Sequence, residues 1–174
     1  VFQFDSIYTC LGSGIKSSDN GRAVHTTLFQ NQKVNASDVL IINGGESIQN
    51  QTGLTMPAIM DNYGNAYLVK EGSVSTELGS SFLTAFFNHG KAVKNGKYAY
   101  QIITGVSDED LEVLSVSQNN PVEVLKFNES AHIVHHHPSK TFAAVVFDVS
   151  AAVNTGKLYG VNIPAIIVMQ ERND

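Results

Sequence analysis

Short apolar or alternating segments recur along the 174-residue chain and are separated by clusters of Gly, Asn, Asp and Ser. This pattern is typical of β-strands joined by turns. It predicts ten strands: Ser6–Leu11, Val24–Gln30, Val39–Ile42, Ala66–Val69, Phe82–Phe87, Tyr98–Thr104, Val122–Phe127, His132–His136, Phe142–Asp148 and Ala165–Gln170. Because helical and strand patterns do not alternate, a parallel α/β sheet is disfavoured. We therefore expect an all-β fold, an antiparallel β-sandwich, with residues 1–174 forming a single domain.

Four clusters contain residues that tolerate positive φ and so predict turns. They are Asn43-Gly44-Gly45, Asn62-Tyr63-Gly64-Asn65, Asn95-Gly96 and Asn154-Thr155-Gly156. Asn95-Gly96 is the strongest hairpin signal of the four, because both residues suit the two-residue turns that join antiparallel strands. It predicts a hairpin connection between Phe82–Phe87 and Tyr98–Thr104.

One segment departs from the strand pattern. Ser107 offers a capping hydroxyl, acidic residues follow in the first turn, and apolar residues then recur at helical spacing. We predict one short helix near Asp108–Val116.

The charge composition limits which classes of binding partner the chain can attract. The formal net charge is -5, so the chain has no overall attraction for nucleic acid or for an anionic membrane, and a polyanionic ligand requires a local cluster of bases. No apolar run is long enough to span a membrane, and residues 1–5 do not have the pattern of a signal peptide. Because the chain starts in a strand pattern without Met, we expect it to be a piece of a longer protein.

The single cysteine, Cys10, excludes an intrachain disulfide and is expected to be buried.

Three stretches in a fixed order carry a family resemblance. They are Cys10-Leu11-Gly12-Ser13-Gly14-Ile15, Thr26-Thr27-Leu28-Phe29-Gln30, and Asn88-His89-Gly90-Lys91 followed by Tyr98-Ala99-Tyr100. The chain resembles the central β-domain of family-eight polysaccharide lyases, which degrade chondroitin, dermatan and hyaluronan. Within that family it is most similar to the broad-specificity chondroitin ABC lyases. The likeness extends over nearly the whole chain, including a hairpin over residues 39–48.

The resemblance implies β-elimination of a glycosaminoglycan by the parent enzyme. In this family the catalytic groups belong to a helical domain that precedes the β-domain, and none of them maps onto this chain. The resemblance therefore implies a non-catalytic domain of a secreted or periplasmic lyase. Its partners would be the polysaccharide and the helical domain, and no cofactor is expected.

A free-standing carbohydrate-binding module is the alternative. Sugar platforms usually rely on Trp or paired Tyr, and the chain has no Trp, while most of its Phe residues fall inside predicted strands. A metal-dependent enzyme is a third possibility, and it depends on the run His132-Ile133-Val134-His135-His136-His137. His135 and His137 would share a strand face, but a metal site needs at least one further ligand, which the sequence does not indicate. We expect solvent-exposed imidazoles before the turn at Pro138-Ser139 and assign no metal site.

Candidate substrate-binding residues are His89, Lys91, Lys94 and Lys97, which form the densest group of bases near a turn. The alternative roles are a hydrogen bond that supports the turn, for His89, and simple solubility, for the lysines. Glu46 is expected to be a solvated hairpin residue. Gly12 and Gly14 flank a serine and are expected to have a structural role where a strand must turn sharply.

Overall fold

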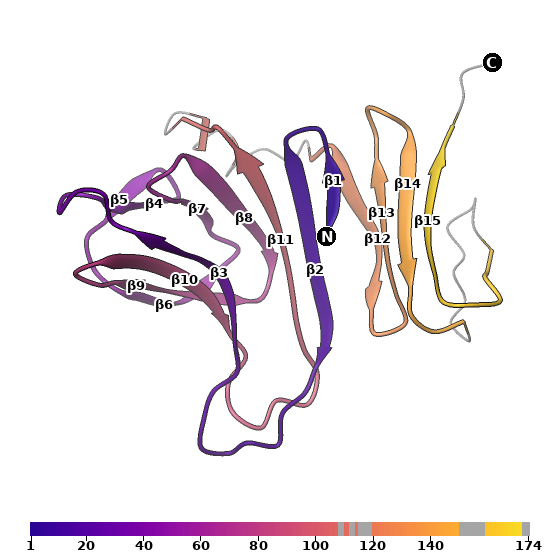
Figure 1. The fold of residues 1–174 in the computed structure, drawn as a ribbon, viewed down its shortest axis with the longest axis horizontal. Coiled ribbons are helices and arrows are strands. Elements are labelled where there is room, and N and C mark those ends of the chain that lie inside the picture. Colours follow the sequence, from indigo (N-terminus) through magenta and orange to yellow (C-terminus); the bar gives the residue numbers. More distant parts are fainter. Residues whose placement is uncertain (108–109, 112–113, 115–119, 150–158, 172–174) are drawn as a thin grey trace. The chain divides into compact units, whose positions relative to one another are not determined.

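The computed structural model describes residues 1–107, 110–111, 114, 120–149 and 159–171. These residues form 15 strands in three antiparallel sheets (Figure 1). They divide into two compact units, the first comprising Val1 and Gln3–Ser117 and the second comprising Phe2 and Gln118–Asp174. The predicted all-β, sandwich-like fold is confirmed. The assignment of all 174 residues to a single domain stays a prediction.

Two sheets build unit 1. The larger has seven strands in the order β1 (Phe2–Phe4), β2 (Ile7–Ile15), β11 (Gly96–Thr104), β8 (Asn65–Glu71), β7 (Ala58–Met60), β4 (Leu40–Ile42) and β5 (Gly45–Ser47). The smaller has four strands in the order β3 (His25–Gln32), β10 (Phe82–Asn88), β9 (Ser73–Leu78) and β6 (Gln51–Thr55).

The core of unit 1 lies between these two sheets. From the smaller sheet, β10 buries Leu83, Ala85 and Phe87, which alternate along the strand because successive side chains point to opposite faces. Tyr67 and Val69 of β8 meet them from the larger sheet. Burial of both inner faces against each other is what defines a β-sandwich.

Unit 2 is built on one four-stranded sheet in the order β12 (Val122–Asn128), β13 (Ala131–His136), β14 (Thr141–Val146) and β15 (Ala165–Gln170). Consecutive strands pair in register, so that Ile133, Ala144 and Ile167 lie side by side on one face. Ala131 and Val146 extend this apolar row, and Val161 packs against it.

Every predicted strand overlaps an observed one, but the structure contains strands that the pattern did not predict. β5 completes the hairpin expected around Asn43-Gly44-Gly45, where Asn43 and Gly44 both have positive φ. Four further strands were missed: β1, β6, β7 and β9. β1 and β7 have three residues each, too few to show a period, and β6 and β9 are rich in Ser, Thr and Gln.

Several turn predictions can be compared with the structure. Gly64 has φ 76° in the turn before β8, as Asn62-Tyr63-Gly64-Asn65 predicts. The hairpin predicted at Asn95-Gly96 is wrong, because β10 and β11 belong to different sheets. The connection crosses from one layer of the sandwich to the other, and each strand pairs with partners elsewhere in the chain. Asn154-Thr155-Gly156 lies outside the described residues.

The sharp turn expected where Gly12 and Gly14 flank Ser13 is an irregularity within β2, where the register with β11 shifts between Gly12 and Ile15. β2 continues through both glycines to Ile15. Gly14 has positive φ, 69°, whereas Gly12 lies opposite Tyr98 of β11, which leaves no space for a side chain.

Most of the predicted helix near Asp108–Val116 lies outside the described residues. Of that segment, Asp110, Leu111 and Leu114 are described and have helical backbone. The Ser107 hydroxyl accepts a hydrogen bond from the Asp110 N–H at 3.2 Å, which is the capping role that the sequence predicts. Among the described residues, no helix is long and apolar enough to cross a membrane.

Candidate polyanion-binding site

Two connections of unit 1 that are distant in sequence lie side by side. Residues 16–24 follow β2, and residues 89–97 lead into β11 and include its first two residues; we call these two segments the paired loops. Their backbones are joined by four hydrogen bonds: Ser17 N to Val93 O (2.8 Å), Ala92 N to Asp19 O (2.9 Å), Val24 N to Gly90 O (2.9 Å) and His89 N to Val24 O (2.9 Å). In Figure 1 they form the tip that extends below β2, β3, β10 and β11.

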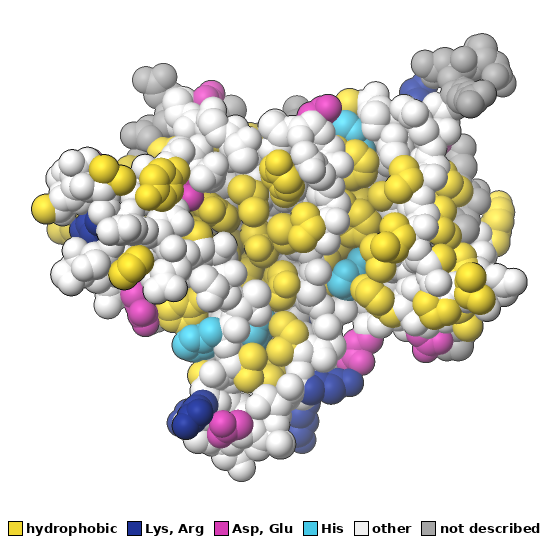
Figure 2. All heavy atoms as spheres, in the orientation of Figure 1, with side chains coloured by type: hydrophobic (Ala, Val, Ile, Leu, Met, Phe, Trp, Pro, Cys, Tyr) yellow, Lys and Arg dark blue, Asp and Glu magenta, His cyan; other side chains and the backbone are white. Residues whose placement is uncertain are grey.

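The paired loops concentrate positive charge. They contain five of the eleven Lys and Arg residues of the chain, all of them exposed: Lys16, Arg22, Lys91, Lys94 and Lys97. Asp19 is the one acidic residue of these two segments, so their formal charge is +4 in a chain of net charge -5. Figure 2 shows Lys and Arg side chains exposed around this tip.

A shallow cavity of about 480 Å³ lies where the loops meet. Lys16 and Lys94 line it together with Ser17, Ser18, Ala92 and Val93. Ammonium groups beside hydroxyls and a small apolar surface suit an anionic sugar, which presents carboxylate or sulfate groups as well as the apolar face of its ring.

Two carboxylates, those of Asp19 and Glu71, contact the bases or the backbone of the paired loops. The Asp19 carboxylate accepts hydrogen bonds from the backbone N–H groups of Gly21 (2.7 Å) and Arg22 (3.2 Å), and so shapes the first loop. Lys97 forms an exposed ion pair with Glu71 of β8. The other four bases of the loops are exposed around this framework.

His89 anchors the second loop to the sandwich. Its Nε2 lies 2.9 Å from the Thr26 hydroxyl, and its backbone N–H donates to Val24 O at 2.9 Å. The ring packs near Phe87 and Tyr98, with centroid distances of 6.3 Å to each. Burial, together with the neighbouring His25, lowers the pKa of His89. Through these contacts His89 supports the second loop, and its contact with substrate stays a prediction.

The structure adds two bases that sequence reasoning did not include. Lys16 and Arg22 stand roughly seventy residues before the predicted lysines, and only the pairing of the loops brings them together. No local signal marks this pairing, because the hydrogen bonds that create it join two connections rather than two strands.

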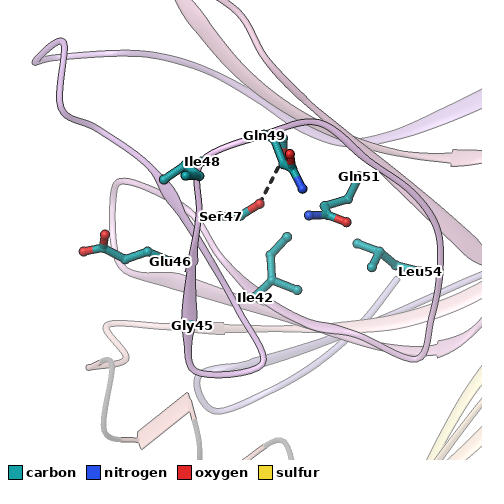
Figure 3. A pocket seen from close by; sticks show the side chains of 8 residues that line it. All are labelled: Ile42, Gly45, Glu46, Ser47, Ile48, Gln49, Gln51 and Leu54. Carbon is teal, nitrogen blue, oxygen red and sulfur yellow. Dashed lines mark hydrogen bonds between the residues drawn. The ribbon is translucent and has the colours of Figure 1, made fainter.

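The remaining sequence candidates occupy other sites. Glu46 is exposed on β5, as expected for a solvated hairpin residue. It is one of the residues that line a second cavity, of about 300 Å³, together with Ile42, Ser47 and Gln51, and its carboxylate points away from those three side chains (Figure 3).

The histidine run in unit 2 divides between the two faces of its sheet. His137 is exposed as expected, whereas His132 and His136 are buried and His135 is half-buried, so the expectation of exposed imidazoles holds only in part. The rings of His135 and His137 lie 4.5 Å apart, and Glu123 is beside them.

Comparison with curated proteins gives two relatives, and no family model matches the chain. The chain is 27% identical to a chondroitin sulfate ABC endolyase of Proteus vulgaris, over all of this chain and 19% of that protein. It is 25% identical to a chondroitin sulfate ABC exolyase of Bacteroides thetaiotaomicron, over 88% of this chain and 16% of that protein. The chain thus spans less than one fifth of the length of these relatives.

Solved structures share the fold. A Paenibacillus xanthan lyase superposes with a TM-score of 0.76 over 98% of this chain and 19% of its own length, at 17% identity. A Streptomyces coelicolor chondroitin AC lyase in complex with chondroitin sulphate gives 0.65 over 97% of this chain and 23% of its own length, at 18% identity. The predicted resemblance to family-eight polysaccharide lyases is therefore confirmed: the chain is a distant homologue of chondroitin ABC lyases and has the β-sandwich fold of a part of chondroitin AC and xanthan lyases.

Proposed function

We propose that this chain is a non-catalytic β-sandwich part of a secreted or periplasmic glycosaminoglycan lyase, which supports the helical catalytic domain and contacts the substrate through the paired loops. The observation that carries the proposal is the convergence of five bases on the paired loops of an otherwise acidic chain. Homology to chondroitin ABC lyases supports the choice of substrate class.

The charge distribution fits a sulfated polysaccharide. At physiological ionic strength, charges attract over roughly 8 Å, so a polyanion senses the local positive charge of the loops rather than the net -5 of the chain. Lysine ammonium groups on flexible stems tolerate variable sulfate positions, because they bind as point charges rather than as planar forks. Such contacts add affinity and speed association more than they define one sugar sequence.

The chemistry of the paired loops does not suit proton abstraction. β-Elimination needs a base beside the uronate, and Tyr98 is the tyrosine nearest His89 among the ring contacts of this site. Burial raises the pKa of Tyr98, which makes its phenolate less accessible, and the ring is stacked on Phe87 at 5.2 Å. These two side chains therefore serve packing and loop position in this proposal.

The binding test uses the 174-residue chain and chondroitin sulfate at low salt. Replacing Lys91, Lys94 and Lys97 with Ser should weaken binding at least tenfold and should reduce the slope of log Kd against log salt. A matched control replaces Lys33, Lys70 and Lys140, which removes the same charge outside the paired loops. Neutral dextran serves as the uncharged ligand. Equal losses in the two triple variants, or equal binding of dextran and chondroitin sulfate, would contradict the proposal.

The Lys16→Ser/Arg22→Ser variant tests the contribution of the first loop. It should weaken chondroitin sulfate binding by a similar factor per charge. Glu71→Gln should strengthen binding, because it removes the negative partner of Lys97. In the parent lyase, the triple lysine variant should raise KM and leave kcat nearly unchanged, since a remote charge contact acts equally on ground and transition states.

A separate assay addresses the absence of catalysis. The isolated chain incubated with chondroitin sulfate should release no unsaturated uronate, measured by absorbance against a heat-treated sample. Product above that background, lost again in a His89→Ala variant, would place a catalytic group in this chain and refute the non-catalytic assignment.

A further inference from the structure

Three side chains of unit 2 converge on one face of its sheet. Glu123 of β12 lies directly opposite His135 of β13 in the antiparallel register. Residues directly opposite each other share a face, and residues two apart along an extended strand share a face as well. His137 follows β13 two residues after His135 and joins them.

The potential ligand atoms of these residues lie close together. One nitrogen or oxygen from each of Glu123, His135 and His137 lies within 4.8 Å of those of the other two. His137 Nε2 and Glu123 Oε2 are 3.3 Å apart. The imidazoles of His135 and His137 meet edge to face at 4.5 Å.

The surrounding residues fix the orientation of the His135 side chain and leave the side chains of His137 and Glu123 free to rotate. The His135 ring is stacked on Phe142 at 4.1 Å and is nearly parallel to it, which holds its orientation. The side chains of His137 and Glu123 are 52% and 53% exposed, so both can rotate. Tetrahedral coordination with bonds of about 2.1 Å places ligand atoms roughly 3.4 Å apart, and small rotations of these two exposed side chains reach that spacing.

An unsatisfied polar atom marks the same cluster. His135 Nε2 is buried and has no hydrogen-bond partner. A buried ring nitrogen without a partner costs free energy, and most such atoms in folded proteins are paired with protein, water or a metal ion. The Glu171 carboxylate is near enough to act electrostatically on His135 and adds negative potential there.

We propose that Glu123, His135 and His137 form a binding site for a divalent transition-metal ion of the zinc class. Two imidazoles and one carboxylate are a ligand set that Zn²⁺ takes with a fourth position open to water, whereas Ca²⁺ and Mg²⁺ prefer oxygen ligands alone. The ion would join β12 to the end of β13, so it would stabilise the sheet of unit 2. The sequence alone indicates His135 and His137 as candidate ligands, and the register of β12 with β13 adds Glu123.

The experiment uses the untagged chain, freed of metal by chelator and titrated with ZnCl₂ by calorimetry. One Zn²⁺ should bind per chain, and CaCl₂ and MgCl₂ should bind at least a hundredfold more weakly. Zn²⁺ should also raise the melting temperature. His137→Ala and Glu123→Gln should each weaken Zn²⁺ binding at least tenfold, while the control His25→Ala, in unit 1, should leave it unchanged.

A second readout does not depend on variants. On addition of Zn²⁺ to the wild-type chain, the imidazole resonances of His135 and His137 should shift together and those of His25 and His89 should not. Zn²⁺ affinity that is the same in His137→Ala as in wild type, or resonance shifts spread over all the histidines, would overturn the site. Binding of Ca²⁺ as tight as that of Zn²⁺ would also overturn it.

Discussion

Gly12 of β2 lies directly opposite Tyr98 of β11, and a Cβ atom on Gly12 would lie 2.3 Å from Tyr98 Cε1. The tyrosine ring covers the glycine and cannot easily move away. It is packed against Phe87 at 5.2 Å and Tyr100 at 5.9 Å. Gly12 therefore makes room for an aromatic cluster that lies beside the paired loops.

Gly12→Ala should destabilise the chain by about 2–4 kcal/mol, because the methyl group forces Tyr98 or the backbone out of its packed position. Urea unfolding followed by circular dichroism measures the change. Gly160→Ala is the control, since a Cβ at Gly160 meets no atom within 4 Å and should change stability by less than about 0.5 kcal/mol. Equal stability of Gly12→Ala and wild type would show that Tyr98 has free space elsewhere.

Asp61 has a buried carboxylate that accepts several hydrogen bonds. It accepts hydrogen bonds from Asn31 Nδ2 (2.9 Å), the backbone N–H groups of Tyr63 and Asn65 (2.9 Å each) and the Tyr67 hydroxyl (3.1 Å). Asp61→Ala leaves these donors unsatisfied and should cost about 2–4 kcal/mol, whereas Tyr67→Phe removes one donor and should cost about 1 kcal/mol. The unfolding free energies of the two variants test this order. A larger loss for Tyr67→Phe would contradict it.

The half-buried His89 makes stability depend on pH. Its pKa in the folded chain is lowered, mainly by burial, so the folded state binds fewer protons than the unfolded state once the pH falls below the unfolded pKa of about 6.5. Stability should therefore decrease as the pH falls from about 7 toward the lower folded pKa.

The urea midpoint of wild type, measured with EDTA present, should fall between pH 7 and pH 5. His89→Gln should show a smaller fall, with the remainder arising from other histidines of lowered pKa such as the buried His132. An identical pH dependence in wild type and His89→Gln would show that His89 does not contribute to the pH dependence of stability.

Cys10 should be unreactive in the folded chain. Its side chain is 5% exposed, and burial raises the pKa of its thiol, so little thiolate is present or accessible near neutral pH. A chromogenic disulfide reagent should modify the native chain at least a hundredfold more slowly than the urea-unfolded chain. Rapid modification under native conditions, with the circular dichroism spectrum unchanged, would contradict the burial of this thiol.

The local sequence was sufficient for much of the fold. Short apolar runs predicted strands such as Phe82–Phe87 and Phe142–Asp148, because runs of four to eight apolar residues bounded by turn residues are typical of buried strands. Asn43 and Gly44 predicted a hairpin, since both tolerate the positive φ that they adopt. The burial of Cys10 followed from the apolar run that contains it.

Tertiary structure alone decided which segments meet. Asn95-Gly96 has the local form of a hairpin, yet it belongs to a crossing between two sheets. Lys16 meets Lys94 only through backbone hydrogen bonds between two connections that are distant in the sequence. Glu123 meets His135 through the register of the consecutive strands β12 and β13. Strand conformation depends on each residue and its neighbours, so the sequence was enough to predict the fold class. Pairing and register depend on which distant apolar faces bury each other, so both candidate sites became visible only in the assembled sheets.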